Sequence, residues 1–267
     1  MGQHKAAYQM YTASGKKIHF AKLLKKVQDA DVIMFGEKHN NAIAHWLQLE
    51  LATELSEKRT LILGAEMFEA DNQPELTAYV KGEMDAKTFA EKARLWPNYS
   101  TDYAPLVDLA KEKGLVFVAS NVPRKYARSV YSSGFDALEE LSTEEKQWIA
   151  PLPIQYDSEL PGYKDMMTMA HGHGGDNLPK AQAIKDATMA HFLLKNHQPG
   201  SLSLHFNGSY HSQNREGIVW YLQQQQPDLK IVTITTEEQD DISQLETDNK
   251  NKADYIIVVD KRVTHTY

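Results

Sequence analysis

One stretch of the sequence decides the fold, and it reads Val32-Ile33-Met34-Phe35-Gly36-Glu37-Lys38-His39-Asn40-Asn41. It begins with four consecutive apolar residues, which are typical of a strand covered on both faces of a sheet. Gly36 permits a sharp turn, and Asn40 or Asn41 is suited to begin the following helix. The stretch therefore predicts that Glu37 and His39 lie at the carboxyl end of a buried strand, where open α/β sheets bind ligands.

The alternation of strand and helix continues along the chain. We expect strands at about 31–36, 60–66, 115–119, 201–206, 230–234 and 255–259, and helices at about 41–57, 180–195 and 214–224. This pattern predicts a single α/β domain over residues 1–267, with a mostly parallel sheet flanked by helices. Residues 125–180 break the alternation, so we expect them to form an inserted helical cap over the carboxyl edge of the sheet.

The overall composition excludes several classes of function. The net charge is −7 and no stripe of Lys and Arg is interleaved with aromatic residues, which argues against a nucleic-acid partner. No apolar run is long enough to span a bilayer. Because the chain has no cysteine, disulfides, thiol nucleophiles and thiolate metal sites are also excluded.

Polar or ionisable side chains follow four of the expected strands. They are Glu37 with His39, Glu66, Asn121 with Arg124, and His205 with His211. Parallel strands bring such residues to one edge of the sheet, although loops are polar in any protein. His39 and His211 are candidate ligands of a divalent metal, and the same residues with Glu37 and Glu66 suit acid–base chemistry. Arg124 is suited to an anionic group of the ligand.

The expected cap has an unusual composition. It contains Tyr156, Tyr163, Met166, Met167, Met169, His171 and His173. Tyr, His and Met all ligate haem iron in proteins, and Met with aromatic residues forms an apolar wall that fits a flat macrocycle. A Met-rich interface between cap and sheet, with a solvated histidine loop, is the alternative interpretation.

Gln182, Asp186 and Met189 share one face of the helix expected at 180–195. We interpret Gln182 and Asp186 as residues that orient the site histidines, in preference to direct catalysis by Asp186. The common P-loop, nucleophile-elbow, zincin and dinucleotide-binding motifs are absent from the sequence.

Several short segments, taken in order, resemble the ChaN family of bacterial haem-binding lipoproteins. They are Gly36-Glu37-Lys38-His39-Asn40-Asn41, Ala65-Glu66-Met67-Phe68, Ala119-Ser120-Asn121-Val122-Pro123-Arg124, the Gln182 to Ala190 helix and Gly208-Ser209-Tyr210-His211. The similarity runs over roughly residues 30–222. The wider group also contains erythromycin esterases and the Tiki metalloproteases.

The resemblance implies a haem-binding protein of a bacterial haem and iron uptake system. It implies haem between sheet edge and cap, a homodimer when loaded, and a tyrosine as axial ligand. Tyr163 is our first candidate for that ligand and Tyr156 the second, while His171 and His173 remain possible ligands. Lys164 is a candidate for the propionates by adjacency, and Met167 for the pocket wall.

The resemblance also carries expectations about place and partners. It implies the periplasmic side of the outer membrane or the cell envelope, attachment through an N-terminal lipid anchor after removal of a leader, and an outer-membrane haem receptor as a possible partner. The enzyme branch of the wider group implies the alternative, a metal-assisted or acid–base hydrolase that uses His39, Glu66 and His211.

Overall fold

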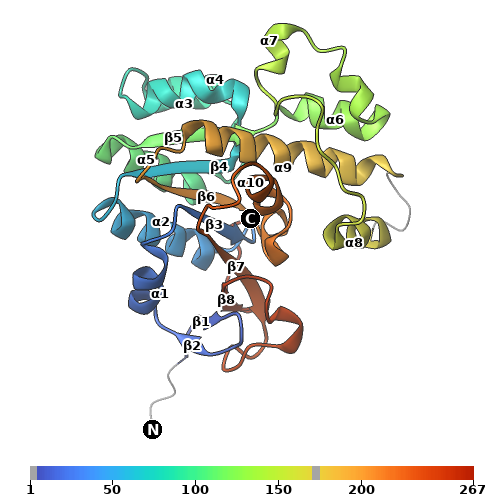
Figure 1. Cartoon of the computed structure of the whole chain (residues 1–267). Helices are drawn as coiled ribbons and strands as arrows, with labels where there is room; N and C mark the ends of the chain where they lie inside the picture. Colours follow the sequence, from blue (N-terminus) through green and yellow to red (C-terminus); the bar gives the residue numbers. More distant parts are fainter. Residues whose placement is uncertain (1–4, 170–174) are drawn as a thin grey trace.

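The sheet confirms the predicted α/β fold. The computed structural model describes residues 5–169 and 175–267, and it has an eight-stranded sheet with the order β2-β1-β8-β7-β3-β6-β4-β5 (Figure 1). The strands are β1 Tyr8–Thr12, β2 Lys17–Ile18, β3 Val32–Glu37, β4 Leu61–Glu69, β5 Val116–Asn121, β6 Leu202–Gly208, β7 Ile231–Gln239 and β8 Tyr255–Asp260. From β8 across to β5, all neighbouring strands are parallel.

Helices connect the parallel strands, as the alternating pattern predicts. They are α1 Phe20–Val27, α2 Ala42–Ser56, α3 Gln73–Val80, α4 Ala86–Lys92, α5 Ala104–Lys113, α6 Arg124–Ser133, α7 Thr143–Lys146, α8 Pro161–Met169, α9 Asn177–Asn196 and α10 Ile218–Gln225. Short turns of other helix types include Tyr99–Tyr103 and Ser209–His211. Among the described residues, no helix has both the length and the apolar character needed to cross a bilayer.

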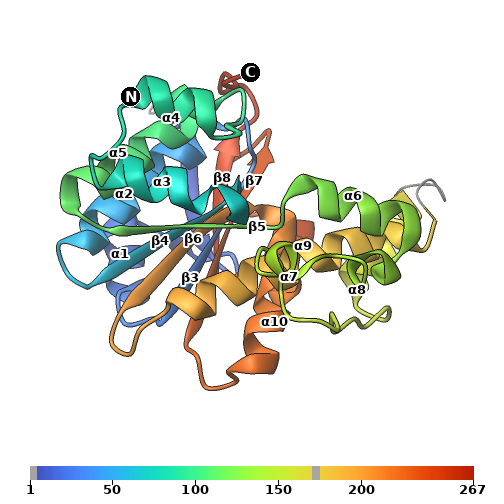
Figure 2. The ribbon, with the colours of Figure 1, turned by 90° about the horizontal axis from the view of Figure 1, so that it is seen from above.

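The two faces of the sheet are covered by different halves of the chain. Helices α1 to α5 lie on one face, and α6, α9 and α10 lie on the other (Figure 2). Strand β3 shows why its sequence is continuously apolar. Ile33 and Phe35 pack in the core under α2 and α5, whereas Val32 and Met34 pack against α9 and α10. Full burial of one such side chain contributes roughly 1.5–3 kcal/mol.

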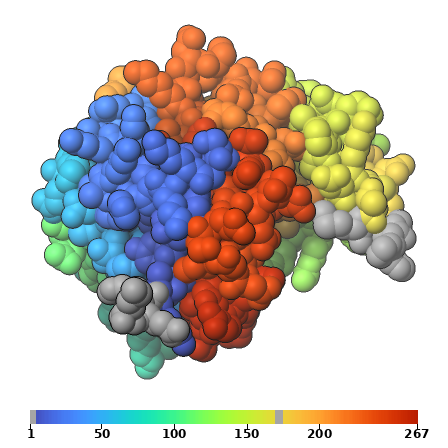
Figure 3. Space-filling view, turned by 90° about the horizontal axis from the view of Figure 1, so that it is seen from below, coloured from blue at the N-terminus to red at the C-terminus, as the bar shows by residue number. Residues whose placement is uncertain are grey.

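One edge of the sheet differs from the sequence prediction. Residues 8–18 form an antiparallel hairpin, β1 and β2, and β1 pairs antiparallel with β8. Figure 3 shows the consequence, because the N-terminal part of the chain (blue) lies beside the C-terminal part (red). No strand is predicted from the sequence before about residue 31, so this hairpin was missed.

The segment between β5 and β6 contains the helices α6 to α9, with little regular structure between α7 and α8. Helix α6 packs against α9 through a core that includes Tyr126, Val130 and Ile184. Between α6 and α8, the regular structure is limited to a short turn at Phe135–Leu138 and to α7. Figure 1 shows α7 and α8 beyond the end of the sheet.

Candidate functional site

The central strands bring four of the predicted site residues together. Strand β6 lies between β3 and β4, and its parallel neighbours carry Glu37 and Glu66. The helices after β3 and β4 pack on one face of the sheet, and the helix after β6 packs on the other. In open α/β sheets, ligands bind at the carboxyl ends of strands whose connections diverge in this way. Glu37, His39, Glu66 and His211 meet at these ends, and we call them the strand-end cluster.

His211 is held between two carboxylates. Its Nδ1 donates to Asp186 (2.5 Å) and its Nε2 donates to Oε1 of Glu66 (3.1 Å). The Gln182 amide lies 2.8 Å from the same ring, so Gln182 and Asp186 on α9 both orient this histidine. Asp186 and His211 are buried, which makes the ionic contacts strong.

Glu37 is a second buried centre of hydrogen bonds. Its carboxylate accepts from the Tyr103 hydroxyl (2.7 Å), the Gln48 amide (2.5 Å) and Nδ1 of His39 (2.9 Å). Gln48 lies in α2 and Tyr103 directly precedes α5, and no sequence pattern predicted a role for either residue. The three donors fix Glu37, and Glu37 in turn fixes the orientation of the His39 ring.

Gly208 separates His39 from Glu66. Its backbone N–H donates to Oε2 of Glu66 (2.7 Å). A Cβ atom at this position would lie 3.0 Å from Nε2 of His39 and 3.5 Å from Oε2 of Glu66. The absence of a side chain therefore allows the imidazole and the carboxylate to approach across the same backbone.

The charges of the cluster follow from these contacts. Burial opposes the charged form of His211, but Glu66 and Asp186 overcome it and raise the pKa of His211 to about 10. Burial likewise disfavours ionised Glu66, yet His211 and His39 hold the pKa of Glu66 well below its usual range. His39 also loses hydration, but its bond to Glu37 and the charge of Glu66 raise its pKa. At neutral pH, His211 is a fixed cation and Glu66 an anion.

A polar cavity of about 680 Å³ opens beside the strand-end cluster. Its lining includes Lys38, Lys252 and Tyr267, together with Glu37, His39 and His211. The His39 side chain is one-third exposed, whereas the Glu37 and His211 side chains are buried. His39 is thus the member of the cluster with the most access to a ligand.

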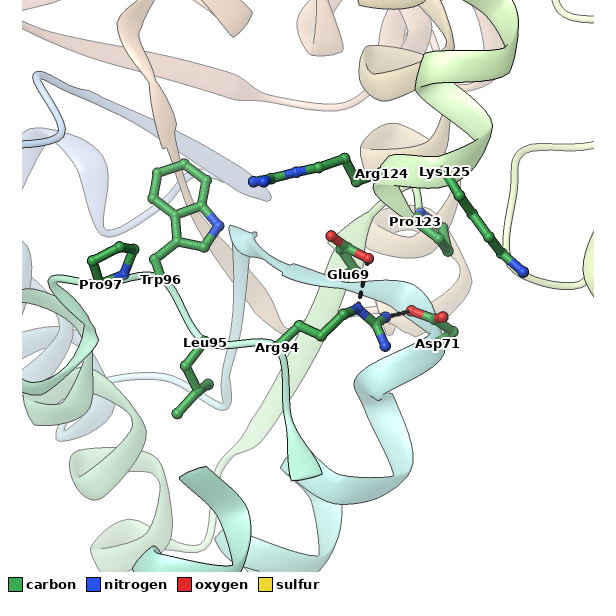
Figure 4. A pocket seen from close by; sticks show the side chains of 9 residues that line it. All are labelled: Glu69, Asp71, Arg94, Leu95, Trp96, Pro97, Pro123, Arg124 and Lys125. Atoms are coloured by element: carbon green, nitrogen blue, oxygen red, sulfur yellow. Dashed lines mark hydrogen bonds and ion pairs between the residues drawn. The ribbon is translucent and has the colours of Figure 1, made fainter. Parts of the chain in front are cut away.

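Two residues expected near the cluster lie elsewhere. His205 is in the interior of β6, where Nε2 contacts the Ser120 hydroxyl at 2.8 Å and burial lowers its pKa to about 4. Arg124 lies in a separate cavity beside α6 (Figure 4). Asn121 lies at the end of β5 and donates to the backbone oxygen of Glu66. The sequence could not separate these positions, because each follows or ends a strand.

The described part of the chain contains no preformed site for the divalent metal that the sequence suggested. Within residues 5–169 and 175–267, no group of three or more His, Asp or Glu side chains is placed to hold a metal ion. Both ring nitrogens of His211 already face carboxylates, and Nδ1 of His39 faces Glu37.

A second cavity, of about 540 Å³, lies between α8 and the start of α9, and we call it the cap pocket. The predicted cofactor residues among its lining are Tyr156, Tyr163, Lys164 and Met167. Lys180 also lines it and was missed, because its position in α9 is read as an ordinary solvated lysine. His171 and His173 lie outside the described residues. No strand-end residue lines this cavity.

Tyr163 is unusual among the residues of the cap pocket. It is 5% exposed, and its hydroxyl has no hydrogen-bond partner among the described residues. Burial, with the nearby charge of Asp186, raises the pKa of Tyr163 far above its usual range. Its ring stacks on Tyr156, with centroids 5.4 Å apart and an interplanar angle of 28°. A buried polar atom without a partner is rare in folded proteins, and a ligand is one of the partners that can satisfy it.

Helix α8 is hydrogen-bonded to the loop that follows β6. The Tyr210 hydroxyl donates to the Gly162 carbonyl (2.7 Å), and the Gly162 N–H donates to Glu216 (2.6 Å). Tyr210 is the neighbour of His211 in sequence. The loop after β6 therefore contacts the helix beside the cap pocket and also carries His211 of the strand-end cluster.

The cap pocket suits haem by the chemistry of its donors. A tyrosine oxygen is a known axial ligand of haem iron. The Tyr163 hydroxyl has no partner of hydrogen-bond geometry among the described residues, although the Tyr221 hydroxyl lies near it and contributes to its raised pKa. Met167 and the two tyrosine rings provide apolar contact, and Lys164 and Lys180 provide cations for carboxylates.

The chain matches one protein family over most of its length. Residues 23–222 match the sequence profile of a family described as "Haem-binding uptake, Tiki superfamily, ChaN". No curated protein sequence matches the chain.

Several solved structures align with the chain over most of its length. ChaN of Campylobacter jejuni, described with cofacial heme binding, aligns with a TM-score of 0.71 and 21% identity over 94% of this chain and 96% of that one. The type III effector HopBA1 aligns with a TM-score of 0.52 and 10% identity, over 89% and 91%. An erythromycin esterase, EreC, in its open conformation gives 0.49 and 12%, over 86% and 77%.

Proposed function

The chain belongs to the ChaN family of haem-binding uptake proteins, and on this premise we propose that it binds haem in the cap pocket, with Tyr163 as the axial ligand. Haem, when bound, supplies an iron that accepts a phenolate oxygen. Tyr163 must give up its hydroxyl proton to serve in this way. The observation that carries the proposal is the buried Tyr163 hydroxyl, which has no other partner among the described residues.

The two lysines of the pocket differ in their suitability for propionates. Lys164 forms an exposed ion pair with Glu159 (2.6 Å), so its charge is already matched. Lys180 contacts only the neutral Asn177 amide (3.0 Å) among the described residues. Lys180 therefore has the charge available for a carboxylate, and we assign it the larger share of propionate binding.

We further propose that two copies of the chain face each other when loaded, and that the protein serves bacterial haem and iron uptake. The family description and the cofacial heme binding of the Campylobacter jejuni protein support this arrangement. We also propose the periplasmic side of the outer membrane or the cell envelope, a lipid anchor and an outer-membrane haem receptor, which rest on the family resemblance alone.

A titration of the haem-free protein with haemin tests the proposal. We expect a saturable shift of the Soret band at micromolar haemin, and a different band for Tyr163→Phe. Tyr131→Phe is the matched control, because Tyr131 lies exposed on α6, 44% accessible and outside the cap pocket. Wild-type protein without a saturable shift would remove the proposal, and an unchanged band in Tyr163→Phe would transfer the ligand role to Tyr156.

The geometry of His39 favours a second candidate function, an acid–base or metal-assisted hydrolase. Its Nε2 is accessible beside Gly208, its Nδ1 is held by Glu37, and its raised pKa suits proton transfer near neutrality. In this mechanism His39 moves the proton, and the fixed pair of Glu66 and His211 orients the substrate. A panel of esters and peptides, with and without divalent metal, tests it. Activity that survives both His39→Ala and Glu66→Gln would argue against this function.

A further inference from the structure

A cavity of about 740 Å³ takes no part in either function described above. It lies among the loop after β4, the loop after α4 and the start of α6 (Figure 4). Its lining shares no residue with the cap pocket or with the polar cavity at the strand-end cluster. We call it the Arg124 pocket.

The charges of the Arg124 pocket leave one cation unmatched. Both acids of the lining, Glu69 and Asp71, are paired with Arg94, the former at 3.0 Å. Lys125 contacts Glu145 (3.3 Å) and the ring of Tyr126, and in Figure 4 it points away from the cavity.

Arg124 differs from these residues. It has no ion pair or hydrogen bond with the chain's described residues, and its side chain extends across the cavity toward Trp96 (Figure 4). Its guanidinium is therefore the cation that an incoming anion would meet. Arginine binds carboxylate and phosphate through two parallel hydrogen bonds, which makes it the preferred residue for such groups.

The side of the pocket that faces Arg124 is apolar. It consists of Leu95, Trp96 and Pro97, with Pro123 beside Arg124. The Trp96 ring is held from behind by edge contacts with His39 (centroids 4.9 Å apart) and Tyr103 (6.0 Å). An indole fixed in this way offers a rigid surface for a planar ligand.

From this juxtaposition we propose that the Arg124 pocket binds a small organic anion, in which a flat aromatic ring rests on Trp96 and Pro97 and a carboxylate or phosphate pairs with Arg124. The anionic group pairs with Arg124, the cation of the pocket that has no acidic partner among the described residues. The ring covers the apolar side of the pocket. Because Trp96 also contacts His39, an occupant of the pocket lies one side chain away from the strand-end cluster.

Calorimetric titration of the full chain with 2-naphthoate tests this site, with the uncharged 2-naphthalenemethanol and inorganic phosphate as comparison probes. We expect saturable binding of naphthoate and much weaker binding of each comparison probe. The naphthalenemethanol lacks the anionic group that pairs with Arg124, and inorganic phosphate lacks the ring that contacts Trp96. Arg124→Gln should weaken naphthoate binding about 10- to 100-fold, the range for loss of a charged hydrogen-bonded contact. Arg128→Gln is the matched control and should leave it unchanged, since Arg128 is exposed one turn further along α6.

Further measurements separate this site from the haem pocket. Trp96→Leu should weaken naphthoate binding, and naphthoate should shift the imidazole resonances of His39. Haem-loaded protein should bind naphthoate as well as haem-free protein does. The proposal is overturned if wild-type protein shows no saturable binding, if Arg124→Gln binds as wild type does, or if haem competes. Because naphthoate binding is measured on haem-free protein, it can succeed or fail independently of haem binding.

Discussion

The strand-end cluster and the cap pocket both contain buried polar side chains, but the two sites differ in how far the hydrogen-bonding capacity of those side chains is satisfied. In the cluster, the Glu66 and Glu37 carboxylates accept hydrogen bonds at both oxygens, and both ring nitrogens of His211 donate. In the cap pocket, the Tyr163 hydroxyl has no partner among the described residues. We infer from this difference that the cluster stabilises the fold through its satisfied hydrogen bonds, whereas the Tyr163 hydroxyl keeps its capacity to bind a ligand.

We expect the largest effect from a substitution that disrupts the hydrogen-bond network of the strand-end cluster. His211→Ala leaves Glu66 and Asp186 buried without their cation, so the free energy of unfolding should fall by about 3–5 kcal/mol. Urea unfolding followed by circular dichroism measures it, with the exposed His265→Ala as control. A loss below about 1 kcal/mol would show that the cluster does not stabilise the fold in this way.

The same network predicts a dependence of stability on pH. The pKa of His211 is raised to about 10 in the folded state, so its contribution is complete below the ordinary histidine pKa of about 6.5. The contribution should be lost as the pH rises from there through about 10. The difference in unfolding free energy between wild type and His211→Gln should therefore shrink between pH 6.5 and pH 10. A difference that stays constant or grows would contradict the raised pKa.

A smaller effect concerns the loop that joins the two regions. Tyr210→Phe removes the hydrogen bond to the Gly162 carbonyl, which should cost about 0.5–1.5 kcal/mol. We expect faster proteolysis around α8 and a few-fold weaker haem binding, while the unfolding midpoint of the sheet changes little. If haem affinity and proteolysis both match those of wild type, the hydrogen bond does not hold the cap.

The smallest expected effect compares two lysines in the cap pocket. Lys180→Gln should weaken haem binding about 3- to 10-fold, because its charge has no acidic partner among the described residues. Lys164→Gln should weaken it less than about twofold, since Lys164 is already paired with Glu159 on the surface. Equal losses from the two substitutions would remove the distinction between these cations.

Much of the architecture follows from local sequence. The apolar run from Val32 to Phe35 predicted the central strand β3, and the position of Glu37 and His39 at its carboxyl end followed from that strand. Glu66 and His211 could be placed at the same edge because parallel strands align their carboxyl ends. The helical period also placed Gln182 and Asp186 on the face that meets His211.

Other features depend on tertiary contacts that no short pattern contains. Tyr103 reaches Glu37 from 66 positions away in sequence, so its role is visible only in the folded chain. His205 has the residue type of a site histidine, yet strand register places it in the interior. Arg124 follows a strand as His39 does, but Trp96 lies between the two and gives Arg124 its own pocket.

The central claim is that haem binds in the cap pocket and not at the strand-end cluster. The most direct measurement is the absorption spectrum of haemin-saturated protein, compared among wild type, the double variant Tyr156→Phe with Tyr163→Phe, and His39→Ala. If haem binds in the cap pocket through a tyrosine ligand, the double variant loses the wild-type Soret band and His39→Ala retains it. A wild-type band in the double variant, together with a changed band in His39→Ala, would contradict the account.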